Sequence, residues 1–263
     1  MTVVFAGVGA DDSNVNAHAP LYPDGRFEYV PIPEKVPGTD ESETFGSWHL
    51  RYDDRTAADL TKRLDTYPED GDARVIRGED AATWPFHRDP NFEALTYGEH
   101  REGFGQYVSR LTSLEPADVV AFYTSLVEEG SDRKHRYLVG YFTVDAVTVI
   151  EPDDSPATKA EKLSRHPENA HAKRATDGVP FYDDKRLVVV DGRQPGGLFE
   201  RLPIRLSEYR ERPDGRGGYY LDPAVGDRFE IVEGSEYMTR KPALVSEMDG
   251  DEFVELVGRP GDR

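Results

Sequence analysis

The sequence contains no cysteine, which excludes a disulfide scaffold, a thiol nucleophile and any metal site built on thiolates. It also has no apolar run that approaches the roughly 20 residues needed to span a bilayer. The short apolar run at residues 2–6 follows no basic segment, so it does not resemble a signal peptide. These absences predict a cytoplasmic protein without a membrane segment.

Lysine is scarce as well. It supplies eight of the 32 basic residues, which face 51 acidic ones, and the formal net charge is -19. Such a surface repels itself in dilute buffer, whereas in molar salt the screening length falls to about 3 Å. The composition is typical of the acidic, halophilic proteomes of archaea. Acidity of this origin does not exclude a nucleic-acid partner, but recognition would have to rest on stacking and hydrogen bonds to a base.

The apolar patterns predict an α+β protein. We expect strands at 2–6, 26–30, 118–124, 137–150 and 186–191, helices at 56–64, 102–114, 156–164 and 251–257, and a turn at 192–197. The strands at 118–124 and 137–150 should form a hairpin that packs on the helix before them. Because strands do not alternate regularly with helices, we expect a mixed, barrel-like β-sheet with flanking helices rather than a doubly wound sheet.

Several familiar nucleotide and hydrolase motifs are missing. Gly7-Val8-Gly9 follows the first strand, but Asp12 stands where the third glycine of a dinucleotide fingerprint would fall, and no helix pattern follows. The chain has no P-loop and no Gly-x-Ser-x-Gly elbow, and without cysteine it cannot complete the His-x-Glu…Pro-Cys-x-x-Cys signature of zinc deaminases. Any chemistry must therefore come from dispersed polar residues.

The first polar cluster is Asp11-Asp12-Ser13-Asn14 with His18, directly after the opening strand. Loops at strand ends often carry function. The alternative is an ordinary solvated acidic loop.

The second cluster is His87-Arg88-Asp89-Pro90. On an extended backbone His87 and Asp89 point the same way, so they could bind a metal or act as a base with its orienting carboxylate. Gln106, at the start of the helix that follows, could read a base edge through its paired donor and acceptor. The alternative is that Asp89-Pro90 is only a turn and capping device.

The third cluster runs from His166 to Asn169 and includes His171, and it could supply a distal histidine to the same pocket. The alternative is an exposed turn. Trp48, Trp84, Tyr97 and Tyr123 could stack on a base, although a lone aromatic residue usually belongs to the core.

The ordered set of segments resembles the third nucleotide modification-associated domain family. The elements that carry the resemblance are Asp12-Ser13, Pro23-Asp24-Gly25-Arg26, Pro31-Ile32-Pro33-Glu34, His87 to Pro90, Gly105-Gln106, Asp118 to Tyr123, Gly140 to Phe142 and His166-Pro167. Ala117 stands where the family usually has glycine before the strand, and Asn14 to Pro20 departs from its Gly-rich loop. The resemblance implies association with DNA base modification or phage-conflict systems.

The order of elements at 103–150 also looks like the core of PUA and EVE-type domains, which are small mixed barrels that hold a modified base. We therefore expect a PUA-like core. The resemblance covers most of residues 1–195, and we expect residues 1–263 to form a single domain in which 196–263 is an extension packed on that core.

The leading interpretation is a protein that binds a nucleotide or modified base in a polar and aromatic cleft. Its expected ligand-binding residues are Asp12, Ser13, His87, Asp89, Gln106 and Tyr123, with no residue assigned to a metal and the cofactor left open. One alternative is a metal-assisted nucleotide transferase or hydrolase that uses His87, Asp89 and His166. A second is a non-catalytic interaction module of a phage-defence system, with defence or DNA-modification proteins as partners.

Overall fold

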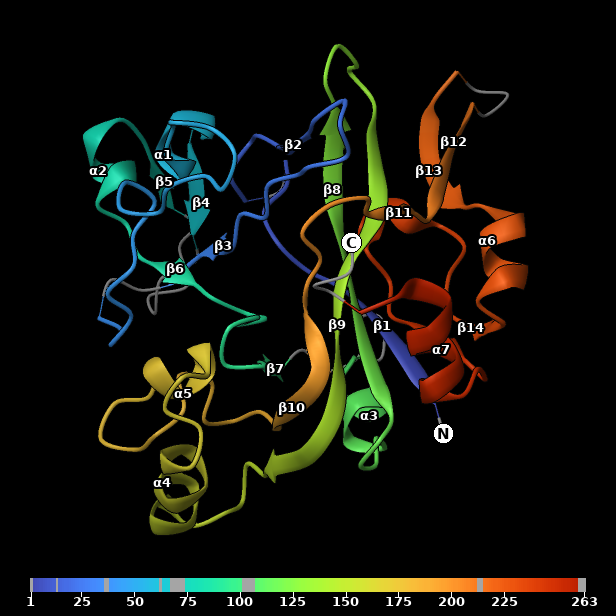
Figure 1. The fold of residues 1–263 in the computed structure, drawn as a ribbon. Coiled ribbons are helices and arrows are strands. Elements are labelled where there is room, and N and C mark those ends of the chain that lie inside the picture. Colours follow the sequence, from blue (N-terminus) through green and yellow to red (C-terminus); the bar gives the residue numbers. More distant parts are fainter. Residues whose placement is uncertain are drawn as a thin grey trace.

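The computed structural model describes residues 2–12, 14–35, 38–61, 63–66, 74–100, 107–211 and 215–259, and one mixed sheet of nine strands organises them (Figure 1). The sheet order is β14, β15, β1, β8, β9, β10 and β7, with β2 beside β8 and β11 beside β9. Parallel pairing joins β1 (Val3–Gly7) to β8 (Val119–Glu128), and β8 forms an antiparallel hairpin with β9 (Lys134–Ile150). The other strands are β2 (Ala19–Leu21), β7 (Thr96–Glu99), β10 (Leu187–Leu198), β11 (Ile204–Arg205), β14 (Ile231–Glu233) and β15 (Leu244–Ser246).

The sheet is open. Strands β14 and β7 stand at opposite ends of the order, and no pairing joins them among the described residues. The α+β class is confirmed, but the predicted barrel-like closure is wrong. Closure requires the end strands to pair with a particular tilt and stagger, and no local sequence pattern encodes that pairing. The PUA-like core, which was expected as a small mixed barrel, is not confirmed.

Both faces of the sheet are covered. Along β1, Val3 and Phe5 belong to one hydrophobic cluster and Val4 and Ala6 to the other, as the period of two in a strand requires. Helix α7 (Gly250–Val257) covers the first face, where Phe253 meets Phe5 edge to face at 5.9 Å between ring centroids. Helix α3 (Tyr107–Thr112) belongs to the cluster on the second face. Burial on both faces explains why these strands read as continuous apolar runs.

Several local predictions are confirmed. The hairpin of β8 and β9 forms, and α4 (Pro156–Ser164) has the predicted bounds. This helix begins where the Ser155 side chain accepts a hydrogen bond from the amide of Thr158, with proline in the first helical turn. Helix α7 begins in the same way, because the Asp249 side chain accepts from the amide of Asp251.

Three local predictions are wrong. Residues 26–30 form isolated bridges at Arg26 and Phe27 instead of a strand. Leu64 belongs to a short strand, because the helix that starts after Thr56 ends at Leu60. Residues 192–197 continue β10 instead of turning, since two register shifts against β9 absorb the extra residues as bulges. Of the helix predicted at 102–114, residues 102–106 lie outside the described residues.

Smaller elements surround the sheet. Three two-stranded ladders pair β3 (Ile32–Pro33) with β6 (Phe86–His87), β4 (Leu64–Thr66) with β5 (Arg74–Ile76), and β12 (Ser207–Glu211) with β13 (Gly217–Leu221). The remaining helices are α1 (Ala57–Leu60), α2 (Glu79–Ala82), α5 (Ala170–Lys173), α6 (Pro223–Arg228) and the 3₁₀ turn η1 (Met238–Arg240). Helix α5 packs against β7. In Figure 1, α5 and β6 both lie to the left of β10.

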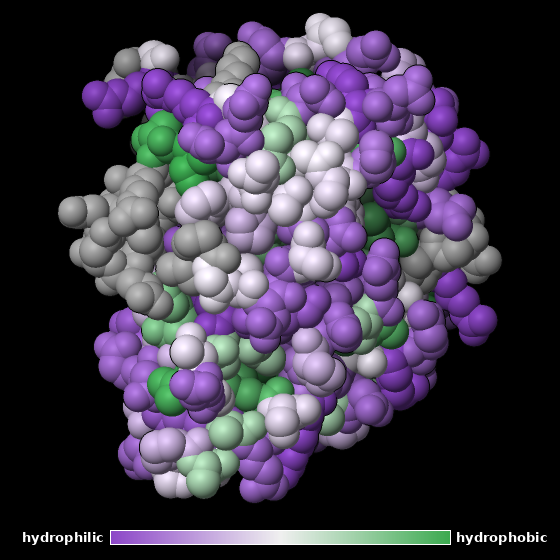
Figure 2. All heavy atoms as spheres, turned by 90° about the vertical axis from the view of Figure 1, so that its left-hand side faces the viewer, coloured by the Kyte–Doolittle hydropathy of each residue, from purple (hydrophilic) through white to green (hydrophobic). Residues whose placement is uncertain are grey.

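The face of the molecule shown in Figure 2 is mainly hydrophilic. On the face shown in Figure 2, apolar residues appear in small separate groups among polar ones. Among the helices of the described residues, none combines the length and apolar character that a bilayer crossing requires.

Candidate functional site

A cleft of about 760 Å³ lies where loops from distant parts of the chain meet. Its walls come from residues 7–14, 32–35, 87–100, 171–182 and 239–241, together with Asp65. The first of these segments begins at the end of β1, so the loop that follows the opening strand contributes to this cleft. A volume of this size is in the range of small-molecule pockets, which is roughly 300–1,000 Å³.

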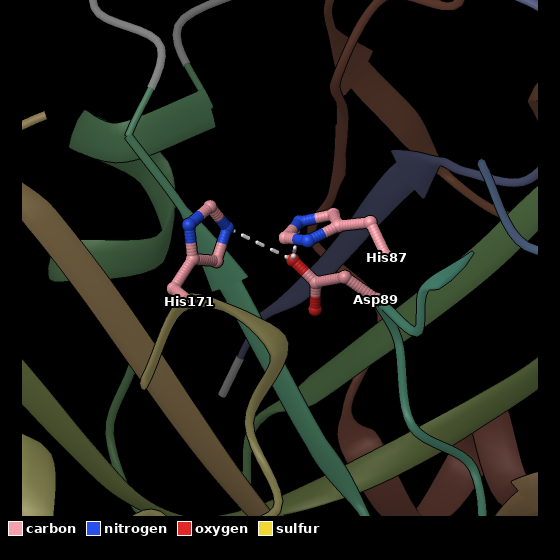
Figure 3. Close-up of side chains that lie close together, drawn as sticks. All are labelled: His87, Asp89 and His171. Carbon is pink, nitrogen blue, oxygen red and sulfur yellow. Dashed lines mark ion pairs between the residues drawn. The ribbon is translucent and has the colours of Figure 1, made fainter. Parts of the chain in front are cut away.

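Asp89 lies at the centre of a cluster in this cleft. Its Oδ1 accepts a hydrogen bond of 2.8 Å from the amide of Gly98 in β7. Its Oδ2 lies 3.1 Å from Nε2 of His171 and 3.6 Å from Nε2 of His87 (Figure 3). All three side chains are buried, with 4–7% of each residue exposed. The carboxylate therefore offers one oxygen to the backbone and the other to two imidazoles.

Local structure around α5 places His171. The Asn169 side chain caps this helix by accepting a hydrogen bond of 3.0 Å from the amide of His171, and its own amide group donates to Oγ1 of Thr96. The imidazole then lies against Gly98 of β7. A Cβ atom at Gly98 would lie 2.4 Å from Cδ2 of His171, so only glycine lets the ring approach this closely.

The other ring nitrogen of His87 faces an ion pair. Its Nδ1 lies 3.1 Å from Oε2 of Glu34 and 2.8 Å from Nη2 of Arg174. Arg174 in turn forms an ion pair with Glu34, in which its Nε lies 2.7 Å from Oε1 of the carboxylate. His87 has two neutral tautomers. With the proton on Nδ1, the ring donates a hydrogen bond to Glu34 and the lone pair of Nε2 faces Asp89. With the proton on Nε2, Nδ1 instead accepts a hydrogen bond from Arg174.

Burial and charge set the protonation of the cluster. Burial alone would raise the pKa of Glu34, but Arg174 and His87 outweigh it and lower that pKa to about 2. Burial would likewise raise the pKa of Asp89, and its contacts with His171 and His87 hold that pKa below the ordinary value. Burial lowers the pKa of His171 by more than the contact with Asp89 raises it. Near neutral pH the cluster therefore combines two carboxylates with a neutral His171.

The structure brings together His87 and Asp89, two of the residues predicted for the site. The histidine that joins them is His171 and not His166, whose Nδ1 pairs with Oδ2 of Asp191 at 3.0 Å. His166 does not line the cleft. The third cluster thus supplies a distal histidine, five residues further along than the one chosen from the sequence.

The other predicted residues are distributed differently. Asp12 is half exposed and contacts His18 and Lys134, while its neighbours Asp11 and Asn14 line the cleft. Tyr123 has no exposed surface and donates a hydrogen bond to the carbonyl of Pro242, so it belongs to the core and cannot stack on a ligand. Ser13 and Gln106 lie outside the described residues.

Sequence reasoning did not assign to the site several residues that the structure places there, among them Glu34, His100, Arg174 and Tyr182. One pattern could have separated His171 from His166: Asn169 is a favoured N-cap residue, which places His171 in the first turn of a helix. Glu34 stands within one of the segments that carry the family resemblance, whereas nothing in the sequence distinguishes Arg174 from other exposed-looking arginines.

Comparison with known families agrees with this ordered set of segments. The model of the nucleotide modification associated domain 3 family matches residues 2–255, so the chain belongs to this family. The description of the family associates it with nucleotide modification. Neither the curated proteins nor the solved structures gave a match.

Proposed function

We propose that this protein binds a nucleotide or a modified base in the cleft that contains His87, Asp89 and His171. The charge of the cleft carries the proposal. Its walls hold four basic side chains, Lys35, Arg174, Arg240 and Lys241, and four acidic ones, Asp11, Asp65, Asp89 and Glu99. The whole chain has 32 basic residues against 51 acidic ones. The cleft therefore repels an anion less than the rest of the surface does, as a phosphate-bearing ligand requires.

An aromatic wall supports the same proposal. The ring of Tyr182 stacks on His100 with centroids 4.3 Å apart and planes 22° from parallel. Both residues line the cleft and are partly exposed. A base that extends this stack would gain about 1–3 kcal/mol, in a way that salt weakens little. Stacking is the form of recognition that an acidic protein in concentrated salt can use.

Calorimetric titration in concentrated KCl tests the proposal, with deoxynucleoside monophosphates and nucleosides that carry modified bases as ligands. We expect saturable binding of one equivalent. Tyr182→Ala should weaken it roughly 5- to 150-fold, the factor that corresponds to the loss of one stacked base.

Trp48→Ala is the matched control. Trp48 lines a separate cleft of about 500 Å³, where it packs beneath Arg88. This variant should bind the ligand as the wild-type protein does. Loss of binding in Trp48→Ala with full binding in Tyr182→Ala would move the site to the other cleft, and no binding of any ligand would remove the proposal.

A metal-assisted nucleotide transferase or hydrolase is the second candidate. The observation that favours it is the convergence of two imidazoles and one carboxylate at the wall of the same cleft. An enzyme of this class needs a bound cation with positions open to substrate.

A further inference from the structure

Three potential metal ligands face one another across a short distance. The nearest ligand atoms of His87, Asp89 and His171 all lie within 4.8 Å of one another, and all three side chains are buried. Imidazole nitrogen and carboxylate oxygen together suit first-row divalent ions such as Zn²⁺, Co²⁺ and Fe²⁺. We infer that these three side chains bind one such ion at the wall of the cleft.

The distances fit a shared cation better than hydrogen bonding alone. Bonds of about 2.1 Å to one ion place neighbouring ligand atoms about 3.0 Å apart at 90° and about 3.4 Å apart at the tetrahedral angle. Oδ2 of Asp89 lies 3.1 Å from His171 and 3.6 Å from His87. The longer separation exceeds a hydrogen bond. One ion between the three side chains is compatible with both separations, and all three ligand atoms lie within 4.8 Å of one another.

The surrounding groups orient the ligands as metal sites require. Glu34 can accept a proton from Nδ1 of His87, which turns the lone pair of Nε2 toward Asp89. The amide of Gly98 occupies Oδ1 of Asp89 and leaves Oδ2 as the single ligand atom. Carboxylate partners of this kind set the tautomer and direction of metal-binding histidines in general.

Charge balance gives a separate argument. The carboxylate of Glu34 is matched by the guanidinium of Arg174, since they form an ion pair of 2.7 Å. The buried carboxylate of Asp89 contacts only the two imidazoles and the Gly98 amide in the contacts that the structure records. A buried carboxylate is costly without a compensating charge, and a divalent ion supplies it. The competing account is a proton shared among the same three groups.

Three protein ligands leave coordination positions free. The cluster lines the cleft, so those positions face space that a small molecule can enter. This is the arrangement of catalytic rather than structural metal sites, which use a closed set of four ligands. The inference deepens the metal-dependent candidate above, but it does not require the cleft to bind a nucleotide.

The test uses the full chain, treated with a chelator and dialysed in concentrated KCl, and titrates it with Zn²⁺ alone. We expect one equivalent to bind. Asp89→Asn and His171→Gln should each weaken binding by more than about 100-fold, because changes to second-layer partners alone cost about 10- to 100-fold. Glu34→Gln should lower affinity within that smaller range and leave the stoichiometry at one.

His135→Gln is the matched control. His135 is also buried, but its Nδ1 contacts the carbonyl of Ser207 and it does not line the cleft. This variant should still bind one equivalent. Binding that survives both ligand substitutions, or that His135→Gln removes equally, would overturn the inference, as would no saturable binding to the wild-type protein.

A measurement on the wild-type protein covers the case in which the ligand variants do not fold. X-ray absorption of the Zn²⁺-loaded chain should show two imidazole nitrogens and carboxylate oxygen at about 2.0–2.2 Å. A shell without imidazole would overturn the inference. Because neither experiment contains a nucleotide, a failure here is distinct from a failure of the nucleotide-binding proposal.

Discussion

Two contacts between a buried histidine and an aspartate look alike when each pair is taken by itself. His171 lies 3.1 Å from Asp89, and His166 lies 3.0 Å from Asp191. The side chain of Asp89 is 5% exposed, whereas that of Asp191 is 35% exposed. A second imidazole reaches Asp89, while Nε2 of His166 makes no hydrogen bond within the described part of the chain.

The difference lies in what surrounds each pair. Water can compensate the partly exposed carboxylate of Asp191, so that pair contributes only the modest energy of an ion pair near the surface. Asp89 is removed from water and held by the Gly98 amide, with Glu34 and Arg174 behind His87. A short distance alone thus does not make a site. A site also needs several side chains that converge, their burial, and neighbouring groups that hold them in place.

The largest contrast should come from removing each carboxylate. Asp89→Ala should abolish nucleotide binding while the protein still folds in concentrated KCl, because the carboxylate orients both imidazoles of the cleft. Asp191→Ala should leave binding unchanged. Calorimetry with the ligand, alongside circular dichroism for folding, checks both variants. Normal binding by Asp89→Ala would take this residue out of the site.

A methyl group at Gly98 should displace His171 from Asp89 and leave the pair of His166 and Asp191 unchanged. Gly98→Ala places Cβ 2.4 Å from the ring of His171, so the imidazole must move off β7. We expect Zn²⁺ affinity to fall at least about tenfold. Gly250→Ala is the control, since its Cβ would meet the carbonyl of Ala117 at 2.7 Å beside α7, away from the cleft. The control should lower the melting temperature and keep the affinity, and equal affinities in the two variants would contradict our account.

Removing His166 should have a small effect on stability alone. Its partner Asp191 is partly exposed, so we expect His166→Ala to cost about 1 kcal/mol. For a chain of this size the melting temperature should fall by about 2–4 °C. Thermal unfolding measures the shift, and ligand titration should show no change. A loss of ligand binding in this variant would restore His166 as a site residue.

A change of salt concentration should have the smallest effect on the difference between the His171–Asp89 pair and the His166–Asp191 pair. If the acidic composition reflects adaptation to concentrated salt, dilution should lower the melting temperature through repulsion across the whole surface. Both histidines are buried and salt screens buried pairs weakly. Wild type and His166→Ala should therefore lose the same number of degrees on dialysis into dilute buffer. An unchanged melting temperature in the wild-type protein would reject the halophilic interpretation.

The sequence predicted the central elements well because their determinants are local. Continuous apolar runs predicted β8 and β9, and the predicted bounds of α4 are correct because Ser155 and Pro156 fix its start locally. Tyr123 shows how the same reasoning limits a site prediction. A strand that is apolar on both faces is buried on both, so a tyrosine within it points into the core and not into a cleft.

The open sheet and the cluster could not be predicted with the same success because they depend on tertiary contacts. Strands β14 and β7 end the sheet without pairing with each other, and the local sequence of neither strand shows this. The contact between Asp89 and His87 was suggested by their spacing in the sequence, although in the structure a tight turn, in which the amide of Asp89 donates to the carbonyl of His87, brings them together. The choice of His171 over His166 depends on the docking of α5 on β7, and the pairing of Glu34 with Arg174 joins residues 140 positions apart.

The hydrogen bond from the Gly98 amide to Asp89 links the cleft to an end strand of the sheet. Strand β7 is terminal in the described order and pairs only with β10 there. A brief opening of β7 would release the carboxylate while the central strands stay intact, since local opening costs less free energy than global unfolding. Occupation of the cleft should therefore slow hydrogen exchange at this one amide. The exchange rate would report whether the cleft is filled before any ligand is identified.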